Sequence, residues 1–317
     1  MSTDARGDAP DHRSGFACLV GRPNAGKSTL TNALVGEKVA ITSGRPQTTR
    51  HTIRGIVNRP DAQLVLVDTP GLHRPRTLLG ERLNDLVRET LTEVDVVVFC
   101  LPADQKVGPG DRYIAAQLAD VMRGRRGTPV VAAVTKADTV SREQLAQHLL
   151  AVDQLGDWAQ IVPVSAVEGY QVGTLTDVLV QHLPAGPELY PGGELTDEPE
   201  AVMVAELVRE AALEGVRDEL PHSLAVVVDE IVPRTRADGS PRPPGDELLD
   251  VRVDVFVERD SQKAIVIGKR GARLRDVGTR ARSGIEALLG SRVYLDLHVK
   301  VAKDWQRDPK QLRRLGF

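Results

Sequence analysis

Residues 21–28 read Gly21-Arg22-Pro23-Asn24-Ala25-Gly26-Lys27-Ser28. This stretch matches the pattern GxxxxGK[ST] in full. The two glycines allow a tight turn in which successive N–H groups point at phosphate oxygens. Lys27 supplies a cation for the β- and γ-phosphates, and the Ser28 hydroxyl is suited to bind Mg²⁺. We therefore predict a nucleotide phosphate site built from these eight residues and Thr29, in the helix that follows.

Short apolar runs precede this motif and recur along the first 185 residues, at 16–20, 63–67, 95–101, 129–134 and 161–164. Continuous apolar strands are typical of a parallel sheet that is buried on both faces. Amphipathic stretches at 111–122 and 141–152 lie between them, the second with Ser141 as a candidate N-cap. This alternation predicts a doubly wound α/β domain.

Further short motifs follow predicted strands. Asp68-Thr69-Pro70-Gly71 ends the run at 63–67, where a carboxylate related to Mg²⁺ and an N–H that senses the γ-phosphate are expected. Thr135-Lys136-Ala137-Asp138 follows the run at 129–134, and Ser165-Ala166 follows the last run.

Composition and charge restrict the class of protein. The chain has 317 residues, 41% hydrophobic and 27% charged, which excludes collagen-like and mostly disordered classes. The net charge of −3 hides an asymmetry, because residues 260–317 hold 14 Lys and Arg against 6 Asp and Glu. Cys18 and Cys100 have no metal-ligand spacing and are predicted to be buried reduced thiols. No apolar run is long enough to span a membrane, which favours a cytoplasmic protein.

The chain divides into two domains by composition. Residues 1–13 are polar and are interpreted as a disordered tail, and 14–185 hold the α/β domain. Residues 186–200 are rich in Pro, Gly and acids and are interpreted as a linker. In 201–317 a long helix at 200–220 is followed by strands at 223–232 and 248–258, and the latter alternates strictly between Val and other residues.

The basic end carries a second anion-binding motif. Gly268-Lys269-Arg270-Gly271 forms a GxxG loop with two cations inside, and Arg273 and Arg275 extend the positive rim. A GxxG loop between two helices is how KH domains clamp about four nucleotides of RNA. We expect RNA contacts from the four loop residues and the two following arginines. Aromatic residues are only 3% of the chain, which disfavours an RNA reader built on stacking.

The order of these motifs resembles the Era family, whose members join a GTPase domain to a C-terminal KH domain. Thr135-Lys136-Ala137-Asp138 is similar to the Asn-Lys-x-Asp signature for guanine, with Thr135 in place of Asn, and Gln47-Thr48-Thr49-Arg50-His51 is similar to the family's switch I. The resemblance covers residues 16–317. It implies a P-loop GTPase domain with a mostly parallel sheet, followed by a smaller α+β type II KH domain.

The resemblance also implies the roles of individual residues. GTP or GDP and Mg²⁺ are the expected cofactors, with Ser28, Asp68 and Thr49 as metal-binding residues and Thr48 as the alternative to Thr49. Asp138 is expected to select guanine, assisted by Lys136 and the Ser165-Ala166 loop. Leu72 occupies the place of the water-orienting Gln of Ras-like proteins. The expected catalytic groups are therefore Lys27, Thr49, Gly71 and Asn24, the last through a bound K⁺ ion.

The implied function is a slow, potassium-stimulated GTPase switch in assembly of the small ribosomal subunit. Its expected partner is small-subunit rRNA near the 3′ end, bound by a monomer that also allows peripheral contact with the inner face of the cell membrane. The alternative, to which Leu72 lends weight, is an RNA-binding scaffold whose G domain binds guanine nucleotide with negligible turnover.

Overall fold

The computed structural model describes residues 12–42, 49–72, 75, 77–123, 127–214, 223–236, 240, 242–243 and 246–317. The chain groups into two compact units, with the main division between Asp197 and Glu198. Among the described helices, none is both long and apolar enough to cross a membrane.

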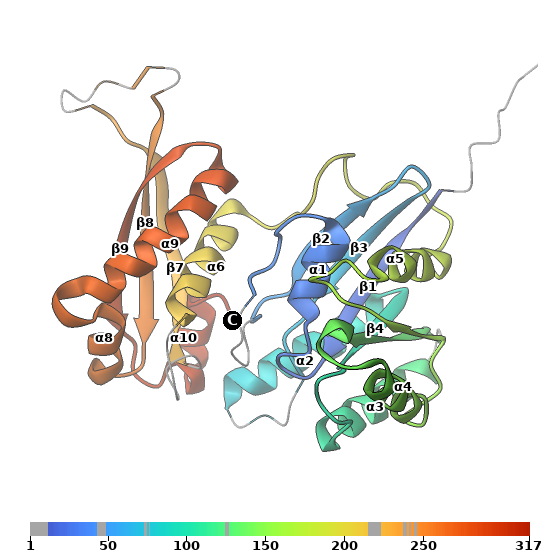
Figure 1. The fold of residues 1–317 in the computed structure, drawn as a ribbon. Coiled ribbons are helices and arrows are strands. Elements are labelled where there is room, and N and C mark those ends of the chain that lie inside the picture. Colours follow the sequence, from blue (N-terminus) through green and yellow to red (C-terminus); the bar gives the residue numbers. More distant parts are fainter. Residues whose placement is uncertain are drawn as a thin grey trace, which may run out of the picture. The chain divides into compact units, whose positions relative to one another are not determined.

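The first unit is a six-stranded sheet covered by helices on both faces (Figure 1). The strand order is β2-β3-β1-β4-β5-β6, and only β2 runs antiparallel to its neighbour. The elements in chain order are β1 (Arg13–Gly21), α1 (Lys27–Val35), β2 (Ile53–Asn58), β3 (Ala62–Asp68), α2 (Leu78–Glu93), β4 (Val96–Pro102), α3 (Pro109–Met122), β5 (Val130–Thr135), η1 (Ala137–Thr139), α4 (Arg142–Asp153), β6 (Gln160–Pro163) and α5 (Val172–Gln181).

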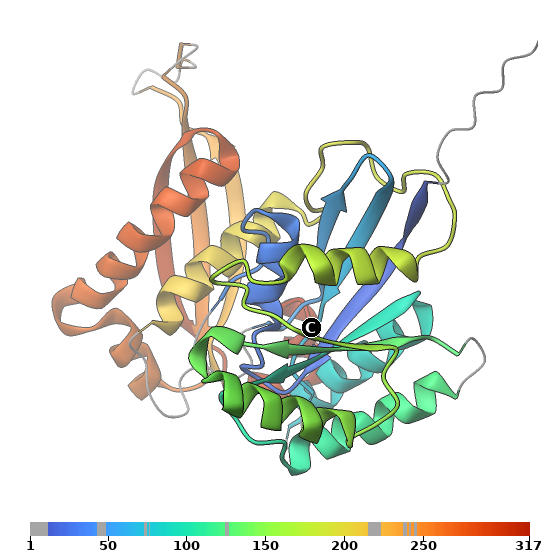
Figure 2. The same cartoon turned by 45° about the vertical axis from the view of Figure 1, so that its right-hand side comes forward.

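The apolar runs are buried on both faces, as the sequence predicts. Alternate residues of each strand enter two different cores. Leu19 and Val98 pack with α1 and α5, whereas Val20 and Phe99 pack with α2, α3 and α4. Figure 2 shows α5 and α1 on the near face of the sheet. Strand order reverses at β1, which lies between β3 and β4, and this is where a doubly wound sheet opens a ligand crevice.

The second unit is a three-stranded sheet with helices on one face (Figure 1). Strand β7 is antiparallel to β8, and β8 is parallel to β9. In chain order the elements are α6 (Glu200–Leu213), β7 (Ala225–Pro233), β8 (Leu248–Val257), α8 (Asp260–Ile267), η2 (Lys269–Gly271), α9 (Ala272–Leu289), β9 (Arg292–Val301), η3 (Trp305–Arg307) and α10 (Pro309–Arg314). This α-β-β-α-α-β order confirms the predicted KH fold class.

The alternation of β8 determines which face is covered. Val251, Val253, Val255 and Val257 are buried in one core with α6, α8 and α9. The predicted helix at 200–220 is shorter in the structure: α6 ends at Leu213, because Glu214 is extended with ψ 133°. The remaining residues of that prediction, 215–220, lie outside the described part of the chain.

Two of the predicted segment boundaries differ from the described structure. The sequence predicts a tail over residues 1–13, but Arg13 already belongs to β1 and pairs with Ala62, and His12 bonds the Gly186 carbonyl at 2.9 Å. The segment predicted as a linker is tied to the first unit. The Gln63 side chain accepts the N–H groups of Leu189 and Tyr190 at 2.6 and 2.9 Å. These bonds explain why the chain leaves the unit only after residue 197.

Both cysteines are free and fully buried, as predicted. Burial raises the pKa of the Cys100 thiol to about 12 and the pKa of Cys18 further. A thiol reacts as its thiolate, so neither side chain is reactive near pH 8.

We predict that a disulfide reagent such as Ellman's reagent titrates no thiol in the native protein at pH 8 and both thiols after denaturation. A Cys100→Ala variant should release one thiol on denaturation. Rapid reaction of either cysteine in the folded protein would contradict the burial on which this prediction rests.

Candidate functional site

The phosphate loop connects the end of β1 to the start of α1, at the crevice edge of the sheet. Gly26 is the N-cap of α1 and adopts a left-handed conformation with φ 86°, which favours glycine. The Lys27 side chain is buried, and its Nζ donates to the carbonyls of Gly21 and Arg22 at 3.4 and 3.2 Å. The backbone of the predicted motif therefore wraps the Lys27 side chain and accepts its hydrogen bonds.

Three predicted metal-binding residues come together beside this loop. Ser28 Oγ donates to Asp68 Oδ2 at 2.6 Å and lies 2.8 Å from Thr49 Oγ1, which in turn lies 3.3 Å from the same carboxylate oxygen. They derive from α1, from the segment before β2, and from the end of β3. The alternative residue, Thr48, lies outside the described residues.

Asp68 is fully buried among these groups. Burial raises the pKa of its carboxyl, and the nearby Lys27 ammonium opposes that shift. Burial likewise lowers the pKa of Lys27, and Asp68 opposes it. Asp68 Oδ1 is buried without a hydrogen-bond partner in the described structure. A buried carboxylate oxygen without a partner beside two hydroxyls is a donor set that suits a hard cation such as Mg²⁺.

The rest of the Asp68-Thr69-Pro70-Gly71 motif lies against the phosphate loop. The Thr69 hydroxyl donates to the Leu19 carbonyl at 2.7 Å. A Cβ on Gly71 would lie 2.6 Å from the backbone N of Pro23, so a larger residue cannot occupy this position. Leu72 donates its N–H to the Gly21 carbonyl at 3.1 Å, and its side chain packs in the core. Leu72 therefore cannot position a water molecule, in agreement with the expectation from its chemistry.

The Thr135 segment approaches the same loop from the other side. The Thr135 hydroxyl donates to the Ala25 carbonyl at 2.6 Å, and the side chain is buried. The hydroxyl thus ties the end of β5 to the phosphate loop. Lys136 is left-handed with φ 56°, and its Nζ lies 2.9 Å from Asp104 Oδ2. Asp138 is exposed in η1.

The Ser165-Ala166 loop adjoins this segment. Ala137 donates its N–H to the Val164 carbonyl at 3.2 Å, which joins the two loops. Ser165 is buried, and its Oγ accepts the Glu168 N–H at 3.1 Å. Hydrogen bonds therefore connect the predicted base-side segments to each other and to the phosphate loop in the first unit.

The GxxG motif forms the turn between α8 and α9 in the second unit. Gly268 and Gly271 have φ of 70° and 76°, and Arg270 between them has φ 53°. Lys269 and Arg270 are exposed. A Cβ on Gly268 would lie 2.7 Å from the Arg273 Cβ, so this position requires glycine. The loop presents two cations on a turn with little side-chain bulk at either end.

The two rim arginines differ in the structure. Arg275 is exposed. The Arg273 guanidinium instead donates to the carbonyls of Ala212 and Glu214 at 3.1 and 2.8 Å, at the end of α6. Arg273 therefore helps to hold the GxxG turn against the end of α6. The sequence did not indicate this contact.

The family models match both units. Residues 16–136 match the model described as 50S ribosome-binding GTPase, and residues 219–306 match the KH domain. The chain is 68% identical to "GTPase Era" of Streptomyces coelicolor over 311 residues, covering 96% of this chain and 95% of that one. It is 64% identical to "GTPase Era" of Nocardioides sp., with both chains covered over their full length. The chain belongs to the Era family of GTPases.

Solved structures of Era agree over both units. One, of Era in complex with MgGDPNP and nucleotides 1506–1542 of 16S ribosomal RNA, matches with a TM-score of 0.87 and 35% identity, covering 96% of this chain and 99% of that one. Another, of a single-residue variant of Aquifex aeolicus Era bound to GDP.AlF4-, matches with the same TM-score and 34% identity over the same shares. The predicted family and fold class are confirmed.

Sequence reasoning missed two ion pairs behind the site. Arg22 Nε lies 2.7 Å from Asp111 Oδ1, where the carboxylate is almost fully buried. The second is the pair between Lys136 and Asp104 described above. Each joins a site motif to the segment between β4 and α3 or to the start of α3. Their partners are 89 and 32 residues apart, so no short-range spacing in the sequence could have indicated them.

We predict that Thr135→Val weakens the binding of guanine nucleotide about 5- to 150-fold. The valine leaves the buried Ala25 carbonyl without its donor, at a cost of about 1–3 kcal/mol. Binding of a fluorescent GDP analogue measures the effect. Thr135→Ser, which keeps the hydroxyl, is the matched control and should bind within about threefold of the natural protein. Equal affinity of the valine variant would show that the bond does not hold the phosphate loop.

Proposed function

We propose that this protein is a GTP-hydrolysing switch that binds small-subunit rRNA near its 3′ end and acts in assembly of the small ribosomal subunit. The observation that carries the nucleotide half is the convergence of Ser28, Thr49 and Asp68 beside the buried Lys27. The relative solved with a GTP analogue and the 16S rRNA fragment supports the pairing of nucleotide and RNA.

In this proposal the described residues divide the work of holding GTP. Lys27 and the N–H groups of the phosphate loop bind the phosphates, and Thr29 continues the loop into α1. Ser28, Thr49 and Asp68 hold Mg²⁺, and Thr49 is favoured over Thr48 by its contacts with the other two groups. Bound there, Mg²⁺ neutralises charge on the β- and γ-phosphates. The Gly71 N–H senses the γ-phosphate, which the close approach of Gly71 to the phosphate loop supports.

The base would be selected on the other side of the crevice. Asp138 is exposed and can accept from the guanine N1–H and 2-amino groups, and the Lys136 stem packs on the ring. The Ser165-Ala166 loop supplies backbone N–H groups for the guanine oxygen. The bond from Thr135 to Ala25 supports this arrangement, because it holds the base-side segment to the phosphate loop as the usual Asn does.

Hydrolysis in this proposal is slow and stimulated by K⁺. Leu72 faces the core, so no side chain at that position orients the attacking water. Asn24 lies in the phosphate loop with φ 62°. Its side chain carries an amide oxygen, a ligand type that suits a hard cation such as K⁺. A cation there neutralises transition-state charge in place of an arginine finger.

The second unit supplies the RNA site. Lys269 and Arg270 contact phosphates, the two loop glycines allow the RNA backbone to approach, and Arg275 extends the contact. Arg273 is proposed to act on this site by fixing the turn to α6. Nucleotide state would alter RNA binding through the segments around Thr49 and Gly71. The family resemblance further suggests a monomer with peripheral membrane contact.

We expect single-turnover GTP hydrolysis to be at least about tenfold faster in KCl than in NaCl, a difference of about 1.4 kcal/mol in barrier height. Asn24→Gly removes the amide and keeps the positive φ, so its rates should be equal in the two salts. Equal rates in the natural protein would contradict the potassium role. Tight GTP binding without hydrolysis, even with small subunits added, would favour the scaffold alternative.

We expect Lys269→Glu with Arg270→Glu to weaken binding of a 3′-terminal small-subunit rRNA fragment at least about tenfold, because two phosphate contacts become repulsive. The slope of log affinity against log salt should fall by about 2 in magnitude. Affinity for GDP should not change. Arg88→Glu with Arg142→Glu, two exposed arginines of the first unit, gives the same change in net charge and should bind RNA normally. Similar loss in both variants would assign the effect to net charge alone.

A further inference from the structure

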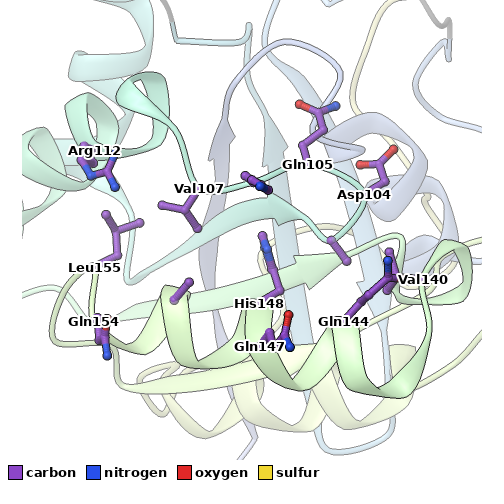
Figure 3. A pocket seen from close by; sticks show the side chains of 13 residues that line it. Asp104, Gln105, Val107, Arg112, Val140, Gln144, Gln147, His148, Gln154 and Leu155 are labelled. Carbon is purple, nitrogen blue, oxygen red and sulfur yellow. The ribbon is translucent and has the colours of Figure 1, made fainter.

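The first unit has an open cavity of about 590 Å³ between residues 103–107 and α4 (Figure 3). A second hollow, of about 500 Å³, shares Arg112, Gln154 and Leu155 with it and continues between α3 and α4. We call the two together the α3–α4 groove. None of the residues predicted to bind nucleotide, metal or RNA lines it, so the proposed function does not account for it.

Hydrogen-bond donors that lack a partner line the first part of the groove. Lys106 and Arg112 are both exposed, and in the described structure neither side chain has an ion pair or hydrogen bond. Gln144 and Gln147 of α4 are exposed on the same lining. The carboxylate of this part, Asp104, is already neutralised by Lys136. The first part of the groove therefore presents two cations and glutamine amides beside one paired carboxylate, and Asp157 is the carboxylate that lines the second hollow.

His148 is the buried polar side chain of the groove. It is only 9% exposed, and its Nε2 has no hydrogen-bond partner in the described structure. Figure 3 shows the ring rising from α4 toward residues 103–107, into the cavity. Burial lowers its pKa, and Asp111, Asp104 and Arg22 are the charged groups that act on it. A buried ring nitrogen without a partner is a position where a ligand gains a hydrogen bond.

The lining matches a polypeptide better than a nucleic acid strand. The lining also includes Val107, Val140 and several alanines, which form an apolar surface against which small side chains of a peptide can pack. The Gln147 amide can both donate and accept, as a peptide backbone does, whereas Gln144 has only its NH2 group available because its Oε1 accepts the Ser141 N–H in the cap of α4. A groove outside a KH fold that binds single-stranded RNA typically stacks bases on aromatic side chains, but Trp158 is tilted against Phe99 and donates to a backbone carbonyl of α4 through Nε1. The exposed side chains of Lys106 and Arg112 favour a peptide that carries carboxylates.

We propose that the α3–α4 groove is a docking site for an acidic segment of a partner protein, and that its occupancy is coupled to the nucleotide site. Two ion pairs join the groove to that site. Asp104 lines the groove and holds Lys136, and Asp111, next in the chain to the groove's arginine, holds Arg22 of the phosphate loop. The same Asp111 accepts the Gly108 N–H at 2.8 Å, which ties residues 103–108 to α3. A bound segment that shifts residues 103–108 therefore acts both on Lys136 and on Arg22 of the phosphate loop.

The docking half is tested by selecting from a displayed library of random dodecapeptides on the full-length protein. We expect the selected peptides to be enriched in Asp and Glu. Their affinity should fall at least about tenfold in Lys106→Glu with Arg112→Glu and should not fall in Arg88→Glu with Arg142→Glu. Replacing the acids of a selected peptide by Asn and Gln should cause a similar loss. Thermal unfolding checks that all variants are folded.

Three results would overturn docking of an acidic segment. The first is selection that yields no peptide sensitive to the double reversal. The second is equal binding of the acidic peptides and their amide counterparts. The third is a twelve-nucleotide uridine strand that binds more tightly than the peptides and loses affinity in the same reversal, which would assign the groove to RNA.

The coupling half rests on the proposed nucleotide site, and GDP binding is therefore measured first. A selected peptide at saturating concentration should change the dissociation rate of a fluorescent GDP analogue at least about threefold. Any change that the peptide causes in GDP affinity should be matched by an equal change that GDP causes in peptide affinity. Asp104→Asn should reduce this effect while the peptide still binds, because it removes one of the two ion pairs that join the groove to the nucleotide site. An unchanged GDP rate in the natural protein would overturn the coupling. Failure of GDP to bind would instead refute the nucleotide site and leave docking to its own test.

Discussion

Two opposite charges, Lys27 and Asp68, are taken out of water at the same edge of the sheet, and the rest of the site depends on this constraint. Each is disfavoured by burial, and each favours the ionised form of the other. An isolated buried charge costs several kcal/mol, so removing either partner leaves the other without compensation. Ser28 and Thr49 offset part of that cost by contacting the Asp68 carboxylate. The protein groups of the site are thus assembled around this pair.

Two kinds of anion recognition explain the uneven charge of the chain. In the proposed function the first unit would bind phosphate with a buried lysine and backbone N–H groups, which is compatible with an acidic surface. In the GxxG loop of the second unit, Lys269 and Arg270 are exposed, and in the proposed function they would act through these exposed side chains. Exposed cations attract an anionic partner best when the surrounding field is also positive. The concentration of Lys and Arg after residue 260 therefore has a physical cause in the second unit alone.

Much of the fold is predictable from the sequence because its strands are continuous apolar runs and its loops carry motifs with strict geometry. The apolar side chains of β3, β4 and β5 point to both faces of the sheet, so both faces must be covered, and all residues of these strands are buried. Strand β2 escapes this kind of prediction, since its Arg and Asn residues are exposed and Gly55 interrupts the apolar pattern. The predicted length of α6 is too great, because its periodicity continues past the extended Glu214. Local patterns identify elements well and locate their ends poorly.

The residues that support the site are harder to predict than the residues within it, and the base-side segment shows why this matters. The Thr135 hydroxyl bonds Ala25 in a buried position, where an unsatisfied carbonyl costs about 1–3 kcal/mol. Lys136 and Asp104 are each about one-third exposed, and exposed ion pairs contribute about 0–1 kcal/mol. Both contacts join segments far apart in the chain, so a motif specifies the groups that meet a ligand, whereas tertiary packing specifies the groups that hold the motif. A ligand in the α3–α4 groove can therefore reposition Lys136 at little cost, while the buried bond keeps the segment on the phosphate loop.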